Sequence, residues 1–367
     1  MRCVPAFALC LALSASGVGA QSSVYQTQQK QSFRFAGDSL LRYQWTRDIP
    51  NPPDGQPNVD RYRVQLRPRV EMSLGPVELG VGGEFNYSKD ENDPEGLEAP
   101  ILIRDNYSSR DARLDLYYGR VKAGPVVAEG GRFFMPLPLT EMIWDHDLRP
   151  LGGALTFETA ERGALSRIAV TGIYAERSHV FEDESYFFGG GLDLGFQTGP
   201  ASQIRLAGTY LEFRDLNGLE PAIRRQNTRV AGLIVYPYRV VDAVARLSSS
   251  GRLPWQLVAN YCWNTAVDEG NRGLWLAAVL GAFGTSRAVL EYTYAKIDRD
   301  ATVAAYNTDD FFWATGWEGH RVDLGTSAGR KASLHAVTQW QRFKDSPDPA
   351  VAEQWVKRFR VELRSSF

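Results

Sequence analysis

The sequence predicts an all-β fold, a transmembrane antiparallel up-and-down β-barrel of about 16 strands with one short periplasmic helix. Apolar and polar residues alternate in segment after segment from residue 32 onward. The alternating segments run for about ten residues, the length of a membrane-crossing strand, whereas strands of a soluble sandwich are nearer five or six residues. The connections between the segments alternate between short turns and long polar loops. Strand length therefore favours the barrel over the sandwich.

Composition excludes several other classes of protein. The chain has 367 residues, a formal net charge of -2 and a mean hydropathy of -0.30. After the start of the chain, no apolar run is as long as the roughly 18 residues of a transmembrane helix, so a helical membrane protein is excluded. Basic and acidic residues number 41 and 43, so no overall positive field favours a nucleic-acid partner.

The start of the chain has the order of a secretory signal peptide. Arg2 precedes an apolar run to Leu13, and small residues end the segment at Ala20. We expect a signal peptide at 1–20, a mobile periplasmic lead-in at 21–31 and an outer-membrane barrel at 32–367. The exported chain then keeps one thiol, Cys262, which can form neither an internal disulfide nor a cysteine metal cluster.

The strands are set out by alternation and by the segments that end them. Clear examples are Tyr62–Met72, Leu192–Phe196, Trp255–Asn264 and Ala288–Ala295, each with apolar residues on one side. Aromatic residues near strand ends suit the headgroup zone of a bilayer; they are Tyr43, Trp45, Tyr87, Tyr210, Trp263, Tyr294, Trp340 and Phe367. Eight long polar loops alternate with short turns, as in outer-membrane barrels with long extracellular loops. Ordinary cross-strand packing is the other explanation of the aromatic residues.

Three segments depart from this pattern. Arg239–Ser249 carries apolar residues at helical spacing, and counting it as a strand would give an odd total, so we interpret it as a helix in a periplasmic turn. The count is then sixteen, with eighteen left open. Pro68 removes a ladder donor inside the second strand, so a bulge or missing bond is expected there. The fifth strand, Val126–Phe134, loses alternation and has an uncertain register.

Two stretches carry a family resemblance. Residues 131–157 read GRFFMPLPLTEMIWDHDLRPLGGALTF, and residues 306–325 read YNTDDFFWATGWEGHRVDLG. Together with the strand pattern they resemble the Gram-negative "putative porin" family of the outer membrane, within the wider porin superfamily. Phe367, after the alternating residues of RVELRSSF, resembles the C-terminal signal read by the barrel-assembly machinery. The resemblance implies a water-filled channel for small polar solutes or ions.

If the apolar side faces lipid, the other side of each strand lines water. The first, second and last strands, which closure brings together, then form a basic pore wall; its residues are Arg34, Arg42, Arg61, Arg63, Arg67, Arg69, Arg358, Arg360 and Arg364. Such charges facing lipid would cost about 2–4 kcal/mol each near the midplane, which fixes the orientation. Pairing with acids such as Asp38, Glu71 and Glu362 is expected for part of this wall.

The long loop at residues 135–152 is the candidate constriction. It carries Glu141, Asp145, His146, Asp147 and Arg149. In porins of similar build the third loop folds inward, which would set its acids across the bore from the arginines. Opposed charges order water and favour polar solutes. We expect passive diffusion through this constriction, although a loop that only caps the barrel is the alternative.

The sequence gives weaker support for other functions. A hydrolase would need a nucleophile and an oriented base, and His146 between two aspartates is the only suggestive cluster, with no HExxH motif. Asp298, Asp300, Asp309 and Asp310 fit no EF-hand spacing and are better explained as solvated loop charge. An exporter for an anionic solute or polymer stays open. No catalytic residue, metal or cofactor is expected; the expected partners are lipid, small polar solutes or ions and the assembly machinery, and a homotrimer is left open.

Overall fold

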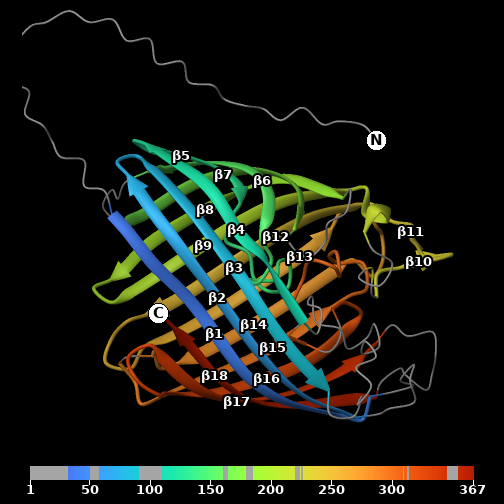
Figure 1. Cartoon of the computed structure of the whole chain (residues 1–367). Coiled ribbons are helices and arrows are strands. Elements are labelled where there is room, and N and C mark those ends of the chain that lie inside the picture. The colour runs from blue at the N-terminus through green and yellow to red at the C-terminus, as the bar shows by residue number, and fades with distance from the viewer. Residues whose placement is uncertain are drawn as a thin grey trace, which may run out of the picture.

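Sixteen antiparallel strands close into one barrel (Figure 1). The computed structural model describes residues 32–49, 58–90, 110–159, 164–178, 185–219, 224, 226–283, 285–308, 310–311, 314–344 and 354–367. The predicted signal peptide and lead-in lie outside the described residues. The barrel strands are β1 (Ser32–Arg47), β2 (Val59–Leu74), β3 (Val77–Asp90), β4 (Arg110–Ala123), β5 (Val126–Arg132), β6 (Pro150–Thr159), β7 (Leu165–Ser178), β8 (Tyr186–Gly199), β9 (Ser202–Arg214), β12 (Tyr238–Ser249), β13 (Trp255–Asn264), β14 (Arg272–Leu280), β15 (Ala288–Ile297), β16 (Trp317–Ser327), β17 (Ala332–Phe343) and β18 (Trp355–Ser366).

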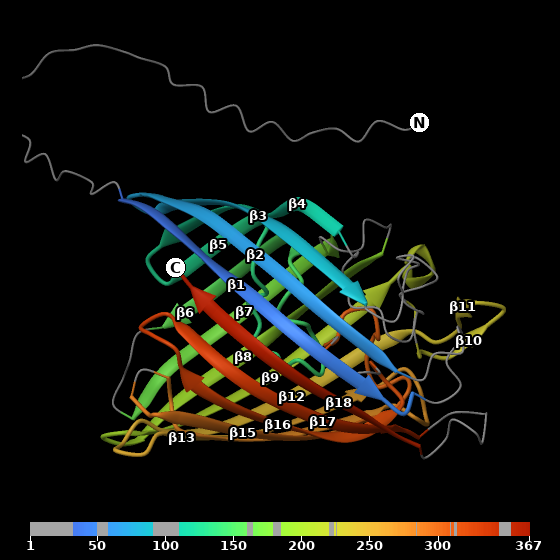
Figure 2. The ribbon, with the colours of Figure 1, turned by 60° about the horizontal axis from the view of Figure 1, so that its bottom comes forward.

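Closure joins the last strand to the first. β1 pairs with β2 on one side and with β18 on the other, and Figure 2 shows the three side by side. Elsewhere each strand pairs with its neighbours in the sequence, except that β9 pairs with β12. A closed sheet leaves no edge of unpaired backbone groups, which is what a bilayer demands of a spanning sheet. The all-β, 16-strand prediction is confirmed.

The predicted periplasmic helix is wrong. Arg239–Ser249 belongs to barrel strand β12, which pairs with β9 and β13 along its length. Val240 and Val244 point inward and are buried, whereas Val241 and Leu247 are exposed on the outside. Apolar residues on both faces hid the period of two and imitated helical spacing. The only helical element among the described residues is the 3-10 turn η1 (Leu216–Gly218).

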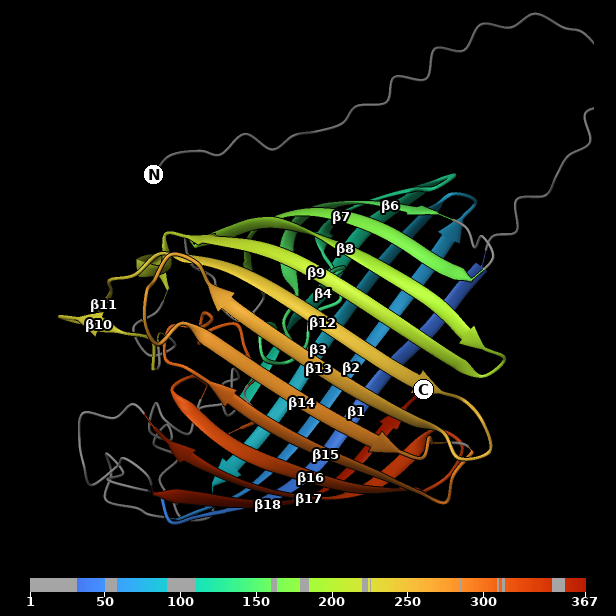
Figure 3. The same cartoon turned by 180° about the vertical axis from the view of Figure 1, so that it is seen from behind.

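The count of sixteen holds because the segment before β12 adds no barrel strand. Between β9 and β12, beyond η1, it forms the small hairpin β10 (Arg229–Val230) and β11 (Leu233–Ile234). Figure 3 shows this hairpin projecting past the barrel at the long-loop end. No helix in the described part of the chain is long and apolar enough to cross a membrane.

Two further irregularities were expected. The β2–β3 ladder has no partner pairs at Arg67 and Pro68, and it resumes in the same register at Arg69. A missing proline donor explains that gap. The register expected to be uncertain in β5 is unbroken against both β4 and β6, and the strand ends at Arg132, two residues earlier than the predicted end at Phe134.

Side chains alternate between the outside and the interior as the sequence indicates. Leu41 is 52% exposed beside Arg42 at 8%, and Phe359 is 41% exposed beside Arg360 at 1%. Outward aromatic residues gather near the long-loop end, where Trp45 lies 4.5 Å from Tyr43 and 5.3 Å from Phe359 between ring centroids. The outside of the barrel is therefore apolar with an aromatic rim, and the charged residues of these strands face inward.

Candidate functional site

The loop between β5 and β6, residues 133–149, crosses the inside of the barrel. Its Glu141 accepts a hydrogen bond from Arg321 of β16 at 2.9 Å, its Asp147 pairs with Arg67 of β2, and its Thr140 bonds to Asn260 of β13. Because β2, β13 and β16 lie at separate places around the barrel, these contacts hold the loop across the lumen rather than above it (Figure 3).

A second loop, between β15 and β16 and described at residues 298–308, 310–311 and 314–316, folds in beside the first. The Asp145 N–H donates to the Tyr306 carbonyl at 2.8 Å, and the Thr308 N–H donates to the Glu141 carbonyl at 2.9 Å. The Trp144 and Tyr306 rings stack at 5.3 Å with an interplanar angle of 7°. The two loops therefore form one unit inside the barrel, and the sequence did not predict the second.

This two-loop unit has its own hydrophobic core against β8 and β9. Tyr306 packs on Phe187 and Phe213, with ring centroids 6.2 and 5.6 Å apart, while Met142 and Ile143 are fully buried. Gly191 of β8 makes room for it, because a Cβ there would lie 3.0 Å from a methyl carbon of Leu137. Burial of large apolar side chains, at about 1.5–3 kcal/mol each, fixes the loops in place.

The arginine wall is neutralised by shared carboxylates. Arg42 lies 2.8 Å from Glu362 and 3.2 Å from Asp310, and Arg360 lies 2.8 Å from Asp310 and 3.0 Å from Glu362. Asp310 belongs to the second loop. One loop carboxylate therefore binds two wall arginines directly, and Arg321 approaches it at 3.6 Å.

The other predicted wall residues have varied surroundings. Arg67 also pairs with Asp38 at 2.7 Å, and Arg69 pairs with Glu71 at 2.9 Å. The remaining contacts are Arg63 to Asn86 at 3.1 Å, Arg358 to the Asp310 carbonyl at 2.9 Å, and Arg364 to Glu362 at 2.5 Å and Asp323 at 3.2 Å. Arg61 is buried near the long-loop end. Arg34 is 65% exposed, 3.4 Å from Glu71, and lies away from this cluster.

The loop acids have three different environments rather than one shared orientation. Asp147 contacts Arg67, Glu141 contacts Arg321, and Asp145 is buried and accepts the Asp147 N–H at 3.0 Å. Arg149 lies 3.5 Å from Asp115 of β4 and donates to the His146 carbonyl at 2.6 Å, so it anchors the base of the loop. Asp147 and Glu141 thus touch the barrel wall instead of facing it across open space, and Asp145 stays within the loop.

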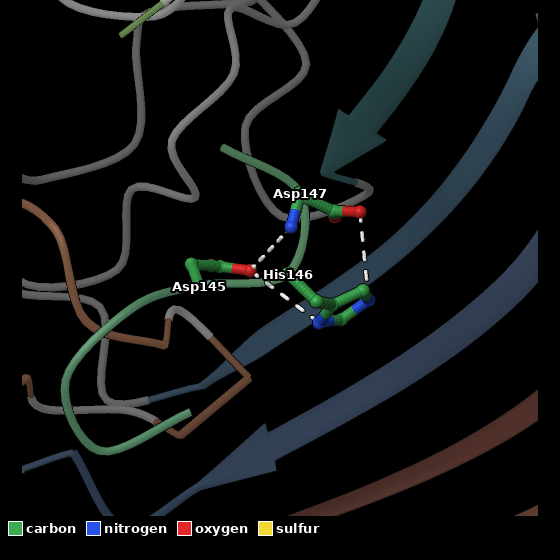
Figure 4. Close-up of side chains that lie close together, drawn as sticks. All are labelled: Asp145, His146 and Asp147. Carbon is green, nitrogen blue, oxygen red and sulfur yellow. Dashed lines mark hydrogen bonds and ion pairs between the residues drawn. The ribbon is translucent and has the colours of Figure 1, made fainter. Parts of the chain in front are cut away.

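His146 lies between two carboxylates (Figure 4). Its Nδ1 is 3.5 Å from Asp145 and its Nε2 is 3.5 Å from Asp147, while 62% of the side chain is exposed. The charge of Asp147 and then of Asp145 raises the pKa of His146 to about 9, although burial opposes the rise. Burial raises the pKa of Asp147, but the Arg67 guanidinium outweighs it and holds that pKa well below the ordinary value.

We expect the protein to lose stability as pH rises through 9. Raising the pKa of a histidine stabilises the folded state fully below its unfolded value near 6.5, and this is lost as pH passes the folded value. The loss is about 1 kcal/mol, because lumen water screens the exposed imidazole. Urea unfolding at pH 6 and pH 10 measures it, and His146→Gln should lose less; an equal loss in both proteins contradicts the assignment.

Asp145, His146 and Asp147 are also the group of side chains in the described residues that could surround a metal ion. Their ligand atoms lie within 4.8 Å of one another. The Arg67 guanidinium contacts Asp147, however, and a cation beside it would be repelled. The positive charge of Arg67 therefore disfavours a cation at this group.

A serine–histidine–aspartate chain lies elsewhere in the lumen. Ser333 Oγ is 2.8 Å from His335 Nε2, and His335 Nδ1 is 2.8 Å from Asp323 Oδ1. Ser333 sits within β17, paired with Ser327 and Arg364 on either side. Sheet pairing occupies the neighbouring backbone N–H groups, so no pair of them is aimed at an oxyanion position.

Two cavities adjoin the two-loop unit. One, of about 350 Å³, lies along β1, β2 and β18 and is lined by six arginines and six carboxylates. The other, of about 420 Å³, lies between the first loop and β12–β14 and is lined largely by apolar residues. Glu141, His146, Glu291 and Arg321 line both.

The sequence missed residues that organise this site. The interpretation of the loop aspartates as solvated charge is wrong for Asp310, paired with arginines, and for Asp300, which is buried and accepts from Tyr238 at 2.5 Å and Thr228 at 2.6 Å. Asp309 lies outside the described residues. Arg321 also went unpredicted. Its inward parity in β16 was a usable signal, since Trp317, Gly319, Arg321 and Asp323 alternate toward the interior.

Comparisons with known proteins show the fold. No protein-family model and no curated protein matches the chain. Among solved structures it is similar to Pseudomonas putida OprB (TM-score 0.59, 11% identity, 91% of this chain and 94% of that chain). It is also similar to Salmonella typhi OmpF, solved with daunomycin (0.53, 12%, 91% and 97%), and to a Rhodopseudomonas blastica porin variant (0.51, 11%, 92% and 100%). The chain has a porin-like barrel; membership of the narrower family named above stays a prediction.

Proposed function

We propose that the protein is an outer-membrane porin that lets small hydrophilic solutes or ions diffuse passively through its lumen. One observation carries the proposal: a closed barrel with an apolar outside encloses charged side chains, cavities of about 350 and 420 Å³ and two inward loops. A soluble protein would not expose this many large apolar residues around its whole circumference. The arginine wall and the loop at 135–152 serve as pore lining and constriction in this proposal.

The charge of the lumen favours polar solutes of low net charge. The six arginines and six carboxylates of the first cavity balance, so neither ion sign is strongly excluded there. Their ordered charges favour dipolar solutes over apolar ones. Size then sets the limit, since the two-loop unit occupies part of the bore.

Liposome swelling tests this function. Vesicles containing the purified protein should swell quickly in arabinose, more slowly in sucrose and not measurably in a large dextran. Protein-free vesicles give the baseline. Swelling no faster than that baseline, from protein shown to be folded by heat-shifted gel migration, would refute passive diffusion.

The proposal also covers location and partners. The exported barrel would be surrounded by outer-membrane lipid, and Phe367 would present the signal for the assembly machinery. In the structure Phe367 stacks on Phe35 at 5.5 Å and its N–H donates to the Gly37 carbonyl at 3.0 Å. A homotrimer is the oligomer that this proposal allows. A polymer exporter fits less well, because Asp38, Asp147, Asp310 and Glu362 interrupt the positive track.

An esterase is the second candidate, favoured by the chain of Ser333, His335 and Asp323. A reactive serine would be labelled by a fluorophosphonate, and Ser333→Ala would abolish the label. We expect no labelling, because sheet pairing occupies the backbone N–H groups beside Ser333, which an oxyanion would need. Labelling that disappears in both Ser333→Ala and His335→Ala would establish catalysis instead.

A further inference from the structure

The second cavity has a chemistry unlike that of the arginine wall. Its volume is about 420 Å³, within the range of small-molecule sites. Met135 and Leu139 of the first loop line one side, and Val258, Ala277 and Val279 of the barrel wall line the other. The interior of a water-filled barrel is ordinarily polar. Apolar side chains that face this cavity therefore need an explanation.

Strand register shows that these apolar residues form a continuous strip. Arg246 of β12 pairs with Val258 of β13, and Val258 pairs with Ala277 of β14. One step toward the short-turn end, Gln256 pairs with Val279. All project inward, and Val258, Ala277 and Val279 remain partly exposed.

Exposure separates this strip from the apolar residues that anchor the loops. Val240 and Val244, which also face inward from β12, are 0% and 3% exposed. Those two belong to the wall beneath the loops, where packing explains them. Ala277 packs partly against the loop core, but Val258 and Val279 do not belong to that packing and stay partly exposed, so loop packing does not account for these two valines.

Arg246 lies at one end of the strip, and its guanidinium has more N–H groups than its two loop acceptors use. Its two terminal nitrogens donate to the Pro138 and Leu139 carbonyls at 3.3 and 3.2 Å. Within the described part of the chain, no carboxylate lies within ion-pair distance of its guanidinium. A guanidinium has five N–H donors, so an anion in the cavity can take those that the two carbonyls leave.

We propose that this cavity is a binding subsite for small amphipathic monocarboxylates. The carboxylate binds Arg246, and a short apolar chain lies along Val258, Ala277 and Val279 opposite Met135 and Leu139. This inference rests on the proposed function and gives the channel a preferred class of solute. The arrangement combines Arg246, which has no carboxylate partner among the described residues, with an apolar surface, while the carboxylates that also line the cavity, Glu141 and Glu291, pair with Arg321. It therefore discriminates against acetate, which lacks the chain, and against alkylammonium ions, which carry the wrong charge for Arg246.

Calorimetric titration of the purified, folded protein tests the subsite with sodium hexanoate. We expect hexanoate to bind at least about tenfold more tightly than acetate or hexylammonium, since each 1.4 kcal/mol corresponds to a factor of ten. Arg246→Gln should weaken hexanoate binding by about tenfold or more. Arg120→Gln, an arginine on the far wall that pairs with Glu78 and Glu129, should leave it unchanged.

Arg246 donates to carbonyls of the first loop, so its replacement could weaken binding by moving that loop. A second variant separates this effect from loss of the subsite. Val279→Thr keeps side-chain shape and touches no loop carbonyl, so it should weaken hexanoate binding roughly fivefold, the cost of about 1 kcal/mol, and leave acetate unchanged. Equal binding of hexanoate and acetate, or no effect of either variant, overturns the inference. A protein that conducts ions without preferring hexanoate is a porin lacking this subsite; one that binds hexanoate without conducting refutes the channel and keeps the subsite.

Discussion

Replacing Asp310 by asparagine should destabilise the barrel by about 3 kcal/mol and shift its ion preference toward anions. Asp310 lies within 3.6 Å of Arg42, Arg321 and Arg360, and the Arg360 side chain is only 1% exposed. Removing the shared carboxylate leaves Glu362 alone to compensate the buried guanidinium groups of Arg42 and Arg360, and breaking a buried ion pair costs about 3–5 kcal/mol in other proteins. Burial raises the pKa of Asp310, but Arg360, Arg42 and Arg321 hold it well below its ordinary value, so the carboxylate is charged at neutral pH.

The change in selectivity follows from the charge balance of the first cavity. Six arginines then face five carboxylates, and the extra positive charge draws anions into this cavity. Reversal potentials in a KCl gradient should show the chloride-to-potassium permeability ratio rising roughly twofold. Asp268→Asn, in an exposed loop at the same end, is the matched control. An unchanged ratio in Asp310→Asn, with folding intact, would remove this carboxylate from the ion path.

Replacing Arg67 by glutamine should release the first loop from the wall and raise conductance. Arg67 joins Asp147 of that loop to Asp38 of β1, and both the Arg67 and Asp147 side chains are largely buried. Without the arginine, Asp147 is left as a poorly compensated charge, and the loop loses its attachment to β2. We expect a loss of about 3 kcal/mol in unfolding free energy and larger, noisier single-channel currents.

Arg69→Gln provides the control for the Arg67 variant. Arg69 lies on the same strand and the same side, but its ion pair is with Glu71 of its own strand, and it meets the first loop only at its base, where its guanidinium lies 5.5 Å from the Phe134 ring centroid. Its replacement should leave channel noise unchanged. If both variants behave alike, the effect comes from wall charge in general, and the proposed attachment of the loop by Arg67 is wrong.

Much of the fold was predictable because lipid and water impose a period of two on a barrel. Leu41 and Arg42, or Phe359 and Arg360, reveal their sides by polarity alone. Polarity did not reveal the two sides of β12, because Val240 and Val244 face the loop core instead of water and both sides of the strand are therefore apolar. Where protein replaces water inside a barrel, alternation no longer distinguishes the two faces.

The site was less predictable because it depends on contacts between distant loops. The wall arginines and the acids of the first loop could be named from strand parity and charge. Their pairing through Asp310 could not, since nothing local in residues 298–316 distinguishes a buried carboxylate from a solvated one. Arg246 and its apolar strip emerged only from the register of three strands.

Single-channel recording of the purified wild-type protein in a planar lipid bilayer tests the central claim most directly. A barrel with a continuous wet lumen narrowed by two loops should give discrete, reproducible conductance steps that grow with salt concentration. Folding is checked on the same preparation by heat-shifted gel migration. Folded, inserted protein that never produces such steps would contradict the account.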